Sequence, residues 1–136
     1  MLTTDITSLI PQRPPILMVS RFECGDDEAC RSELDIDESN MFLAEGQVAA
    51  EGIVEHIAQT AAAYIGYRRK QAGEDVNLGF IGDIKRCSFG DTMPTAGQTV
   101  TTEMRVVSQV GNITMISAES KVDGELVASC RMKLAN

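Results

Sequence analysis

The sequence has 136 residues, and its 20 acidic and 12 basic side chains give a formal net charge of −8. This charge argues against a nucleic acid partner, because phosphate binding needs a surplus of Lys and Arg. No apolar run approaches the roughly 18 residues of a membrane-spanning helix, and the N-terminus lacks the basic start and apolar core of a signal peptide. We therefore expect a cytoplasmic protein without a membrane span, folded as a single domain over residues 1–136.

Residues 3–10 favour a short helical turn with Thr4 or Asp5 as its N-cap. Three prolines between residues 11 and 15 then predict an extended, rigid entry into the domain. The four cysteines contain no C-x-x-C pair and have no histidine nearby in the sequence, so no metal site is predicted. In a reducing compartment they would be small, buried or half-buried apolar side chains. We expect them to have no functional role.

Two strands are predicted before residue 40. Residues 16–23 form an apolar run, residues 29–35 alternate between apolar and polar positions, and the turn between them makes a hairpin. Residues 37–50 have no firm period, and Gly46 indicates a turn there.

The segment 51–67 is the one long stretch that is typical of a helix. It is apolar around most of its circumference, which predicts that it is buried. Glu55, His56 and Gln59 are the polar residues near its start, and Glu55 and Gln59 share a face because they are four residues apart. A carboxylate in such a helix is costly unless it is paired or used. Three cations, residues 68–70, suit the negative end of the helix dipole.

The chain after the helix contains strand signals alone. Strands are predicted at 78–89, 99–107, 113–122 and 125–134. Turns are expected at residues 111–112 and, as a type I′ hairpin, at Asp123-Gly124. The resulting fold class is α+β, with an antiparallel sheet wrapped around one long central helix. One helix covers one face of such a sheet and leaves its edges open, so we expect a dimer.

Four segments carry a resemblance to a known family. Gly52-Ile-Val-Glu-His-Ile-Ala-Gln59 resembles the helix start of the hot-dog-fold 3-hydroxyacyl-acyl carrier protein dehydratases. Residues 9–21 are similar to the entry motif of that family, residues 80–89 to its strand after the helix, and residues 122–128 to its last hairpin. The segments follow the family's order over nearly the whole chain. The nearest likeness is to the members of aryl-polyene and flexirubin pathways.

The resemblance implies a hot-dog dimer with two active sites at its interface. Each site would receive an acyl chain on the phosphopantetheine of an acyl carrier protein or on coenzyme A, and the protein would need no cofactor of its own. In the family a helix Glu is acid or base on the β-hydroxyl, and an upstream His removes the α-proton. Backbone N–H groups at the helix start hold the thioester oxygen.

Glu55 takes the place of the family Glu, and Gln59 takes that of the family Gln. Gly52 fits the glycine at the helix start, although its spacing to the Glu is two residues shorter. The upstream His is absent, because Gln47 stands in its place and His56 is the only histidine in the chain. The residues expected to contact substrate are Gln47, Gly52, Ile81 and Gly82. Carrier docking is expected at Arg68, Arg69 and Lys70, with Lys85 and Arg86 as further candidates.

Several functions remain open from the sequence. His56 would either replace the missing His as a catalytic group or be a half-buried histidine that is hydrogen-bonded at an interface or to a strand. Glu55 alone could also move the proton from carbon to hydroxyl. A hot-dog thioesterase would use Glu55 with Gln59 or Gln47 to activate water. A catalytically degenerate subunit would bind a carrier protein or pair with an active dehydratase.

Overall fold

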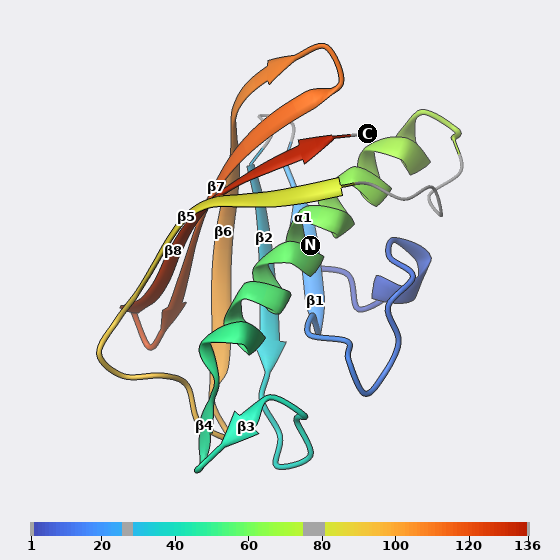
Figure 1. The fold of residues 1–136 in the computed structure, drawn as a ribbon. Coiled ribbons are helices and arrows are strands. Elements are labelled where there is room, and N and C mark those ends of the chain that lie inside the picture. Colours follow the sequence, from blue (N-terminus) through green and yellow to red (C-terminus); the bar gives the residue numbers. More distant parts are fainter. Residues whose placement is uncertain (1, 26–28, 75–80, 136) are drawn as a thin grey trace.

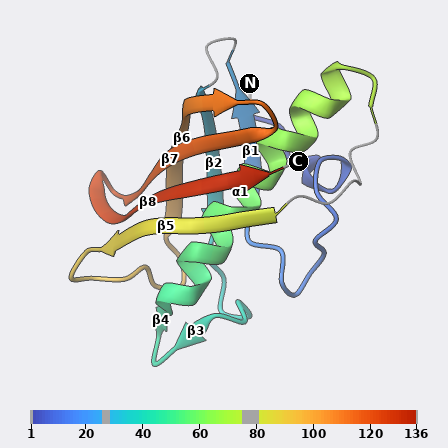
Figure 2. The ribbon, with the colours of Figure 1, turned by 45° about the horizontal axis from the view of Figure 1, so that its top comes forward.

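The computed structural model describes residues 2–25, 29–74 and 81–135. One helix, α1 (Ala50–Gln71), runs across one face of a six-stranded antiparallel sheet (Figures 1 and 2). In the sheet the strands follow the order β1-β2-β6-β7-β8-β5. Their bounds are β1 (Arg21–Cys24), β2 (Ala29–Asp35), β5 (Ile81–Phe89), β6 (Thr99–Val110), β7 (Ile113–Val122) and β8 (Glu125–Ala135). The predicted α+β arrangement is confirmed.

The helix has the predicted position and ends. It is buried along most of its length, and its last turn carries the three predicted cations. Gly73, with a φ of 73°, takes the left-handed conformation that stops a helix. At the other end the N-cap residue is Ala49, which makes no side-chain cap. Within the described ranges, no helix is long and apolar enough to cross a membrane.

The hairpin turns follow from backbone conformation. Asp123 and Gly124 both have positive φ, 50° and 82°, as the predicted type I′ turn between β7 and β8 requires. Glu45 and Gly46 repeat this pattern, with φ of 54° and 83°. They join β3 (Leu43–Ala44) to β4 (Gln47–Val48), a small separate hairpin next to the start of α1 (Figure 1). The sequence predicted the turn at Gly46 but not these strands, because two residues are too few to show a period.

The N-terminal segment differs from the prediction. The short helical turn is present as η1 (Ile6–Ser8), with Asp5 at its N-cap. The proline segment, however, makes a turn at its end, with a cis Pro14–Pro15 peptide and a hydrogen bond from the Ile16 N–H to the Arg13 carbonyl. The strand predicted over residues 16–23 begins only at Arg21. The reason is a tertiary contact, since side chains of α1 bind the backbone of residues 16 and 18 in place of a neighbouring strand.

The core between helix and sheet contains a row of buried hydroxyl groups. Ser32 on β2 pairs in register with Thr102 on β6, which pairs with Ser120 on β7. All three are fully buried at positions where their strand neighbours on the same face are apolar. Two helix residues, His56 and Thr60, meet this row. The helix is therefore held to the sheet by directional hydrogen bonds as well as by apolar packing.

The cysteines correct the expectation that they are simple apolar side chains. Cys24 on β1 stands directly opposite Cys30 on β2, and Cys87 on β5 stands opposite Cys130 on β8. Both pairs form disulfides, so none of the four cysteines is free. The sequence spacing could not reveal this pairing, because it depends on strand register.

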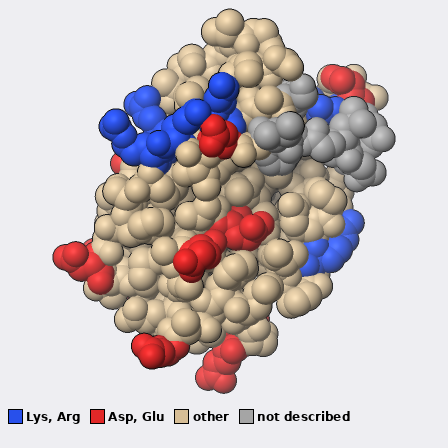
Figure 3. Space-filling view, viewed as in Figure 1, with Lys and Arg blue, Asp and Glu red and all other residues tan. Residues whose placement is uncertain are grey.

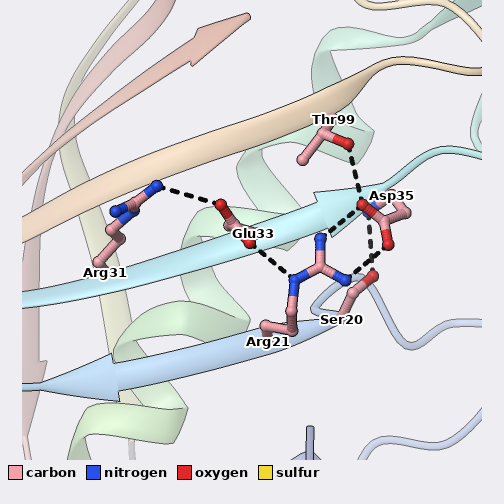
Figure 4. Close-up of polar contacts among 6 residues, drawn as sticks. All are labelled: Ser20, Arg21, Arg31, Glu33, Asp35 and Thr99. Atoms are coloured by element: carbon pink, nitrogen blue, oxygen red, sulfur yellow. Dashed lines mark hydrogen bonds and ion pairs between the residues drawn. The ribbon is translucent and has the colours of Figure 1, made fainter. Parts of the chain in front are cut away.

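The outer face of the β1–β2 hairpin carries an ion cluster (Figure 4). Arg21 contacts Glu33 through Nε at 2.7 Å and Asp35 through Nη2 at 2.6 Å. Arg31 adds a contact of 3.1 Å to Glu33, and the Thr99 hydroxyl donates to Asp35. The hydrogen bond from Arg21 holds the pKa of Asp35 below its ordinary value. This cluster ties the edge strand β1 to β2 at the surface.

Candidate functional site

The predicted pair Glu55 and Gln59 is brought together in the first half of α1. The Gln59 side chain is buried and Glu55 is half-buried. Gln59 Nε2 donates to Glu55 Oε2 at 2.8 Å, as expected for residues four apart on a helix. Among the described residues, Glu55 Oε1 receives no hydrogen bond. One oxygen of the carboxyl is thus fixed, and the other is available for chemistry.

Gln59 also binds the backbone of the entry segment, the residues 9–21 that lead into β1. Its Oε1 accepts from the Met18 N–H at 2.6 Å, and its Nε2 donates to the Ile16 carbonyl at 2.8 Å. The Met18 N–H can only donate, so the amide orientation of Gln59 is fixed with Nε2 toward Glu55. Every polar atom of this buried amide has a partner.

His56 is a helical neighbour of Gln59, three residues before it, and points about 100° around the helix from Glu55. Its ring is fully buried, with Nδ1 at 2.6 Å from the Met18 carbonyl oxygen and Nε2 at 2.7 Å from Thr102 Oγ1. Burial lowers its pKa to about 4, against the opposing effect of the Met18 carbonyl. The sequence left two interpretations of His56 open, a catalytic group or a hydrogen-bonded buried histidine. The geometry corresponds to the second. No hydrogen bond joins it directly to Glu55 within the described ranges.

The partners of His56 were not predicted from the sequence. Thr102 and Ser120 are 2.6 Å apart and extend the contact from the helix to β7. A signal was present, because each stands between apolar residues at the neighbouring inward positions of its strand. A polar residue at such a position needs a buried partner.

Gly52 and Gln47 both lie near the start of α1. Gly52 allows close packing there, whereas Gln47 is exposed. A Cβ atom on Gly52 would lie 2.8 Å from the side chain of Val48 and closer still to Phe42, so the glycine lets the helix start approach these residues. Its N–H donates to the Ala49 carbonyl at 2.9 Å. Gln47 is exposed on β4, where it bridges to Thr95. Neither contacts Glu55 through a hydrogen bond in the described part of the chain.

Ile81 and Gly82 both lie in the edge strand β5, opposite residues 135 and 134 of β8. Gly82 is exposed. Ile84 and Phe89 pair with inward-facing residues of β8 yet remain 42% and 41% exposed. The apolar face of β5 is thus left uncovered by the helix.

The expected docking cations lie far from Glu55. Residues 68–70 are about 14 positions further along α1, a distance of roughly 20 Å at 1.5 Å per residue. Arg68 lies 6.0 Å from the centre of the Tyr64 ring. A second group of cations gathers over β5 and β8, at the upper left of Figure 3. The cations on these strands are Lys85, at the irregularity of β5, and the register-paired residues Arg86, Arg131 and Lys133.

One cavity lies away from Glu55 and Gln59. A cavity of about 630 Å³ lies along β1, β2, β6 and β7 and is lined by Glu23, Arg31, Glu103, Arg105 and neighbouring residues. None of its lining residues belongs to the predicted site. Among the residues that the structure describes, no group of three or more potential ligands could hold a metal ion.

Comparison with known proteins places this geometry in context. The model of a family described as ApeP-like, ApeP dehydratase, matches residues 4–136. The 3-hydroxyacyl-[acyl-carrier-protein] dehydratase FabZ of Staphylococcus carnosus is 26% identical over 137 residues, covering 96% of this chain and 92% of that protein.

Solved structures support the same fold. The dehydratase heterocomplex ApeI:P from Xenorhabdus doucetiae superposes with a TM-score of 0.82 at 15% identity, covering 96% of this chain and 90% of that one. A mutant of the thioesterase PA1618 from Pseudomonas aeruginosa gives a TM-score of 0.58 at 16% identity, covering 85% and 78% of the two chains. The fold is the hot-dog fold that the sequence predicted.

Proposed function

Since the chain belongs to the ApeP-like family of dehydratases, we propose that it interconverts 3-hydroxyacyl and 2-enoyl thioesters of an acyl carrier protein in fatty-acid or polyene-type biosynthesis, with Glu55 as acid and base. The observation that carries this proposal is the state of Glu55. Its carboxyl is half-buried near the start of the central helix, with Oε2 held by Gln59 and Oε1 unbound among the described residues. Coenzyme A thioesters are the alternative substrates.

Glu55 moves the proton in this reaction. As a carboxylate it takes the α-proton of the substrate, and the electrons of the broken C–H bond move toward the thioester oxygen. The carboxyl group then returns the proton to the β-hydroxyl while the enolate electrons form the Cα=Cβ double bond and the C–O bond breaks, so that water leaves and the carboxylate is regenerated. Backbone N–H groups at the uncapped start of α1 and the positive end of its dipole stabilise the enolate oxygen.

In the alternative route, with two acid–base groups, the second group would come from a partner subunit. Glu55 has an amide partner, Gln59, and the one histidine of the chain is enclosed in the core. The uncovered apolar face of β5, with Ile84 and Phe89, suits a second hot-dog subunit, either a copy of this chain or a related dehydratase subunit. The similar structure from Xenorhabdus is a dehydratase heterocomplex, which supports the second of these. Such a subunit would complete the site beside Glu55.

The acyl carrier would dock on cations. The sequence expectation is the helix end at residues 68–70, and the strand cluster of Lys85, Arg86, Arg131 and Lys133 is an alternative. In the strand cluster Arg86 stands directly opposite Arg131, an arrangement that is unfavourable unless an anion binds there. Charge reversals in each group, compared for the KM of the carrier-bound substrate, would separate the two surfaces.

The test is an assay of 3-hydroxyacyl and 2-enoyl thioesters on both carriers, with wild type and Glu55→Gln side by side. We expect hydration and dehydration in the wild type and a loss of at least about 100-fold in kcat for Glu55→Gln, which keeps the shape but cannot exchange a proton. The chain would be assayed alone and with a related dehydratase subunit. Unchanged interconversion in the variant would contradict the role of Glu55.

The Glu55–Gln59 contact favours a second candidate, a thioesterase. In such an enzyme Glu55 Oε1 would activate a water while Gln59 holds the other carboxyl oxygen, and PA1618 shares the fold. Release of free thiol that depends on Glu55 would establish this function in place of the first. Absence of any turnover, alone or with a partner, would favour a subunit that binds the carrier or pairs with an active dehydratase.

A further inference from the structure

A continuous series of hydrogen bonds leads from the sheet to Glu55. Ser120 on β7 contacts Thr102 on β6 at 2.6 Å, and Thr102 contacts His56 Nε2 at 2.7 Å. His56 Nδ1 lies 2.6 Å from the Met18 carbonyl oxygen, and the N–H of Met18 donates to Gln59 at 2.6 Å. Gln59 in turn donates to Glu55. The series crosses two strands, the helix and the entry segment.

The direction of each bond near His56 is fixed by its neighbours. The Met18 carbonyl can only accept, so His56 Nδ1 carries the proton. With its lowered pKa the ring is neutral near pH 7, so Nε2 is an acceptor and the Thr102 hydroxyl donates to it. Thr102 Oγ1 then accepts from the hydroxyl of Ser120. The Met18 carbonyl therefore selects the Nδ1-protonated tautomer, and the two hydroxyls complete the hydrogen bonds that this tautomer needs at Nε2.

The Met18 residue is held from both sides by one helix. His56 binds its carbonyl and Gln59 binds its N–H, and these two side chains are three residues apart on α1. A shift of Met18 would move the Gln59 amide, and with it the bond that orients Glu55. Gln59 also donates to the Ile16 carbonyl, so the same amide positions both the entry segment and the Glu55 carboxyl.

We propose that His56 is a positioning residue for Glu55, acting through Met18 and Gln59, and that Thr102 and Ser120 hold its ring in the Nδ1-protonated tautomer. This inference rests on the proposed function of Glu55. It assigns His56 no contact with substrate and no proton transfer. A histidine with a structural role alone would affect the stability of the fold but not the setting of Glu55.

The first test measures the protonation state of the two ring nitrogens of His56 by NMR. Because the chain has one histidine, 15N-labelled histidine gives a spectrum of His56 alone. We expect a protonated Nδ1 and an unprotonated Nε2, with no change from about pH 8 to about pH 5, since this range lies above the pKa of about 4. A protonated Nε2, or a titration near the ordinary value for histidine, would overturn the proposal.

The second test interrupts the series at one hydroxyl and uses its neighbour as a control. Thr102→Val removes the donor to His56, whereas Ser32→Ala removes the hydroxyl that pairs with Thr102 in strand register but contacts Thr60 instead. Both hydroxyls are fully buried, so both variants should lower the Tm. We expect only Thr102→Val to reduce kcat, by roughly threefold to tenfold with KM unchanged, because misplacement of a reacting group slows the chemical step. Thr102→Ser, which keeps the hydroxyl, should restore the rate.

A readout that does not need turnover separates this inference from the proposed function. The side-chain NH2 signal of Gln59, identified by its loss in Gln59→Leu, should shift in Thr102→Val and stay in place in Ser32→Ala. If Glu55→Gln kept full activity, the proposed function would fail while the Gln59 signal still showed whether His56 positions the carboxyl. An unmoved Gln59 signal, or an unchanged kcat in Thr102→Val of an enzyme that depends on Glu55, would overturn the positioning role.

Discussion

The two faces of strand β2 carry polar groups in opposite surroundings. On the inner face Ser32 is fully buried and bonds to Thr60 of the helix at 2.7 Å. On the outer face Glu33 and Asp35 share the guanidinium of Arg21, and the side chains of Arg21 and Asp35 are 29% and 53% exposed. The inner contacts involve neutral groups without water, whereas the outer contacts join full charges in contact with solvent.

This difference in surroundings decides how much each contact contributes to the free energy of unfolding. A buried polar group that loses its partner costs about 1–3 kcal/mol, because water cannot replace the lost bond. An exposed ion pair contributes about 0–1 kcal/mol, since water and salt already stabilise the separated charges. The chain therefore depends more on the neutral contacts of His56, Thr60 and Thr102 than on its visible salt bridges.

The largest effect is expected from His56→Leu. Leucine has a similar volume, but it leaves the Met18 carbonyl and the Thr102 hydroxyl without their partner in the core. We expect a loss of about 3 kcal/mol in the free energy of unfolding, measured by urea denaturation. His56→Gln, which retains a donor and an acceptor, is the matched control and should lose less. Equal stability of the two variants would mean that these bonds contribute little.

The pH dependence of stability should follow from the same ring. The folded pKa of His56 is about 4 and its ordinary value is 6.5, so the unfolded chain binds a proton at a higher pH than the folded one. The stabilisation from a neutral His56 is therefore fully present above pH 6.5 and is lost as the pH falls toward 4. The loss amounts to about 3 kcal/mol. Urea denaturation at several pH values should show this slope in wild type and not in His56→Leu, whereas equal slopes would contradict it.

The smallest effect is expected on the outer face. Arg21→Gln removes both ion pairs to Glu33 and Asp35, yet it should cost no more than about 1 kcal/mol, with the difference from wild type shrinking in high salt. The pKa of Asp35 should rise toward its ordinary value, which carboxyl 13C NMR would detect. A loss as large as that of His56→Leu would reverse the comparison between the two faces.

The sequence was most informative where one pattern decides the structure. The bounds of β2 and β7, the length of α1 and the turn at Asp123-Gly124 agree with periodicity and turn chemistry. It failed at residues 16–20, because an apolar run predicts a strand although side chains of the helix bind this backbone. That outcome depends on contacts some 40 residues apart in sequence.

Part of the candidate site could likewise be predicted from the sequence, and part could not. Glu55 and Gln59 could be paired from helical spacing, and their contact is confirmed. The role of His56 remained open, since its neighbours Met18 and Thr102 come from other elements and are fixed only by the packing of helix on sheet. The role of each of these residues in chemistry stays a prediction until variants are assayed.

The positions of the two disulfides have a consequence for how copies of the chain can associate. Cys24–Cys30 joins β1 to β2, and Cys87–Cys130 joins β5 to β8, so each edge strand of the sheet is bonded to its inner neighbour. Domain swapping requires an edge strand to leave its own sheet and insert into that of another molecule. With both bonds formed, neither edge strand can be exchanged in this way. A dimer formed at either edge would therefore join two complete sheets.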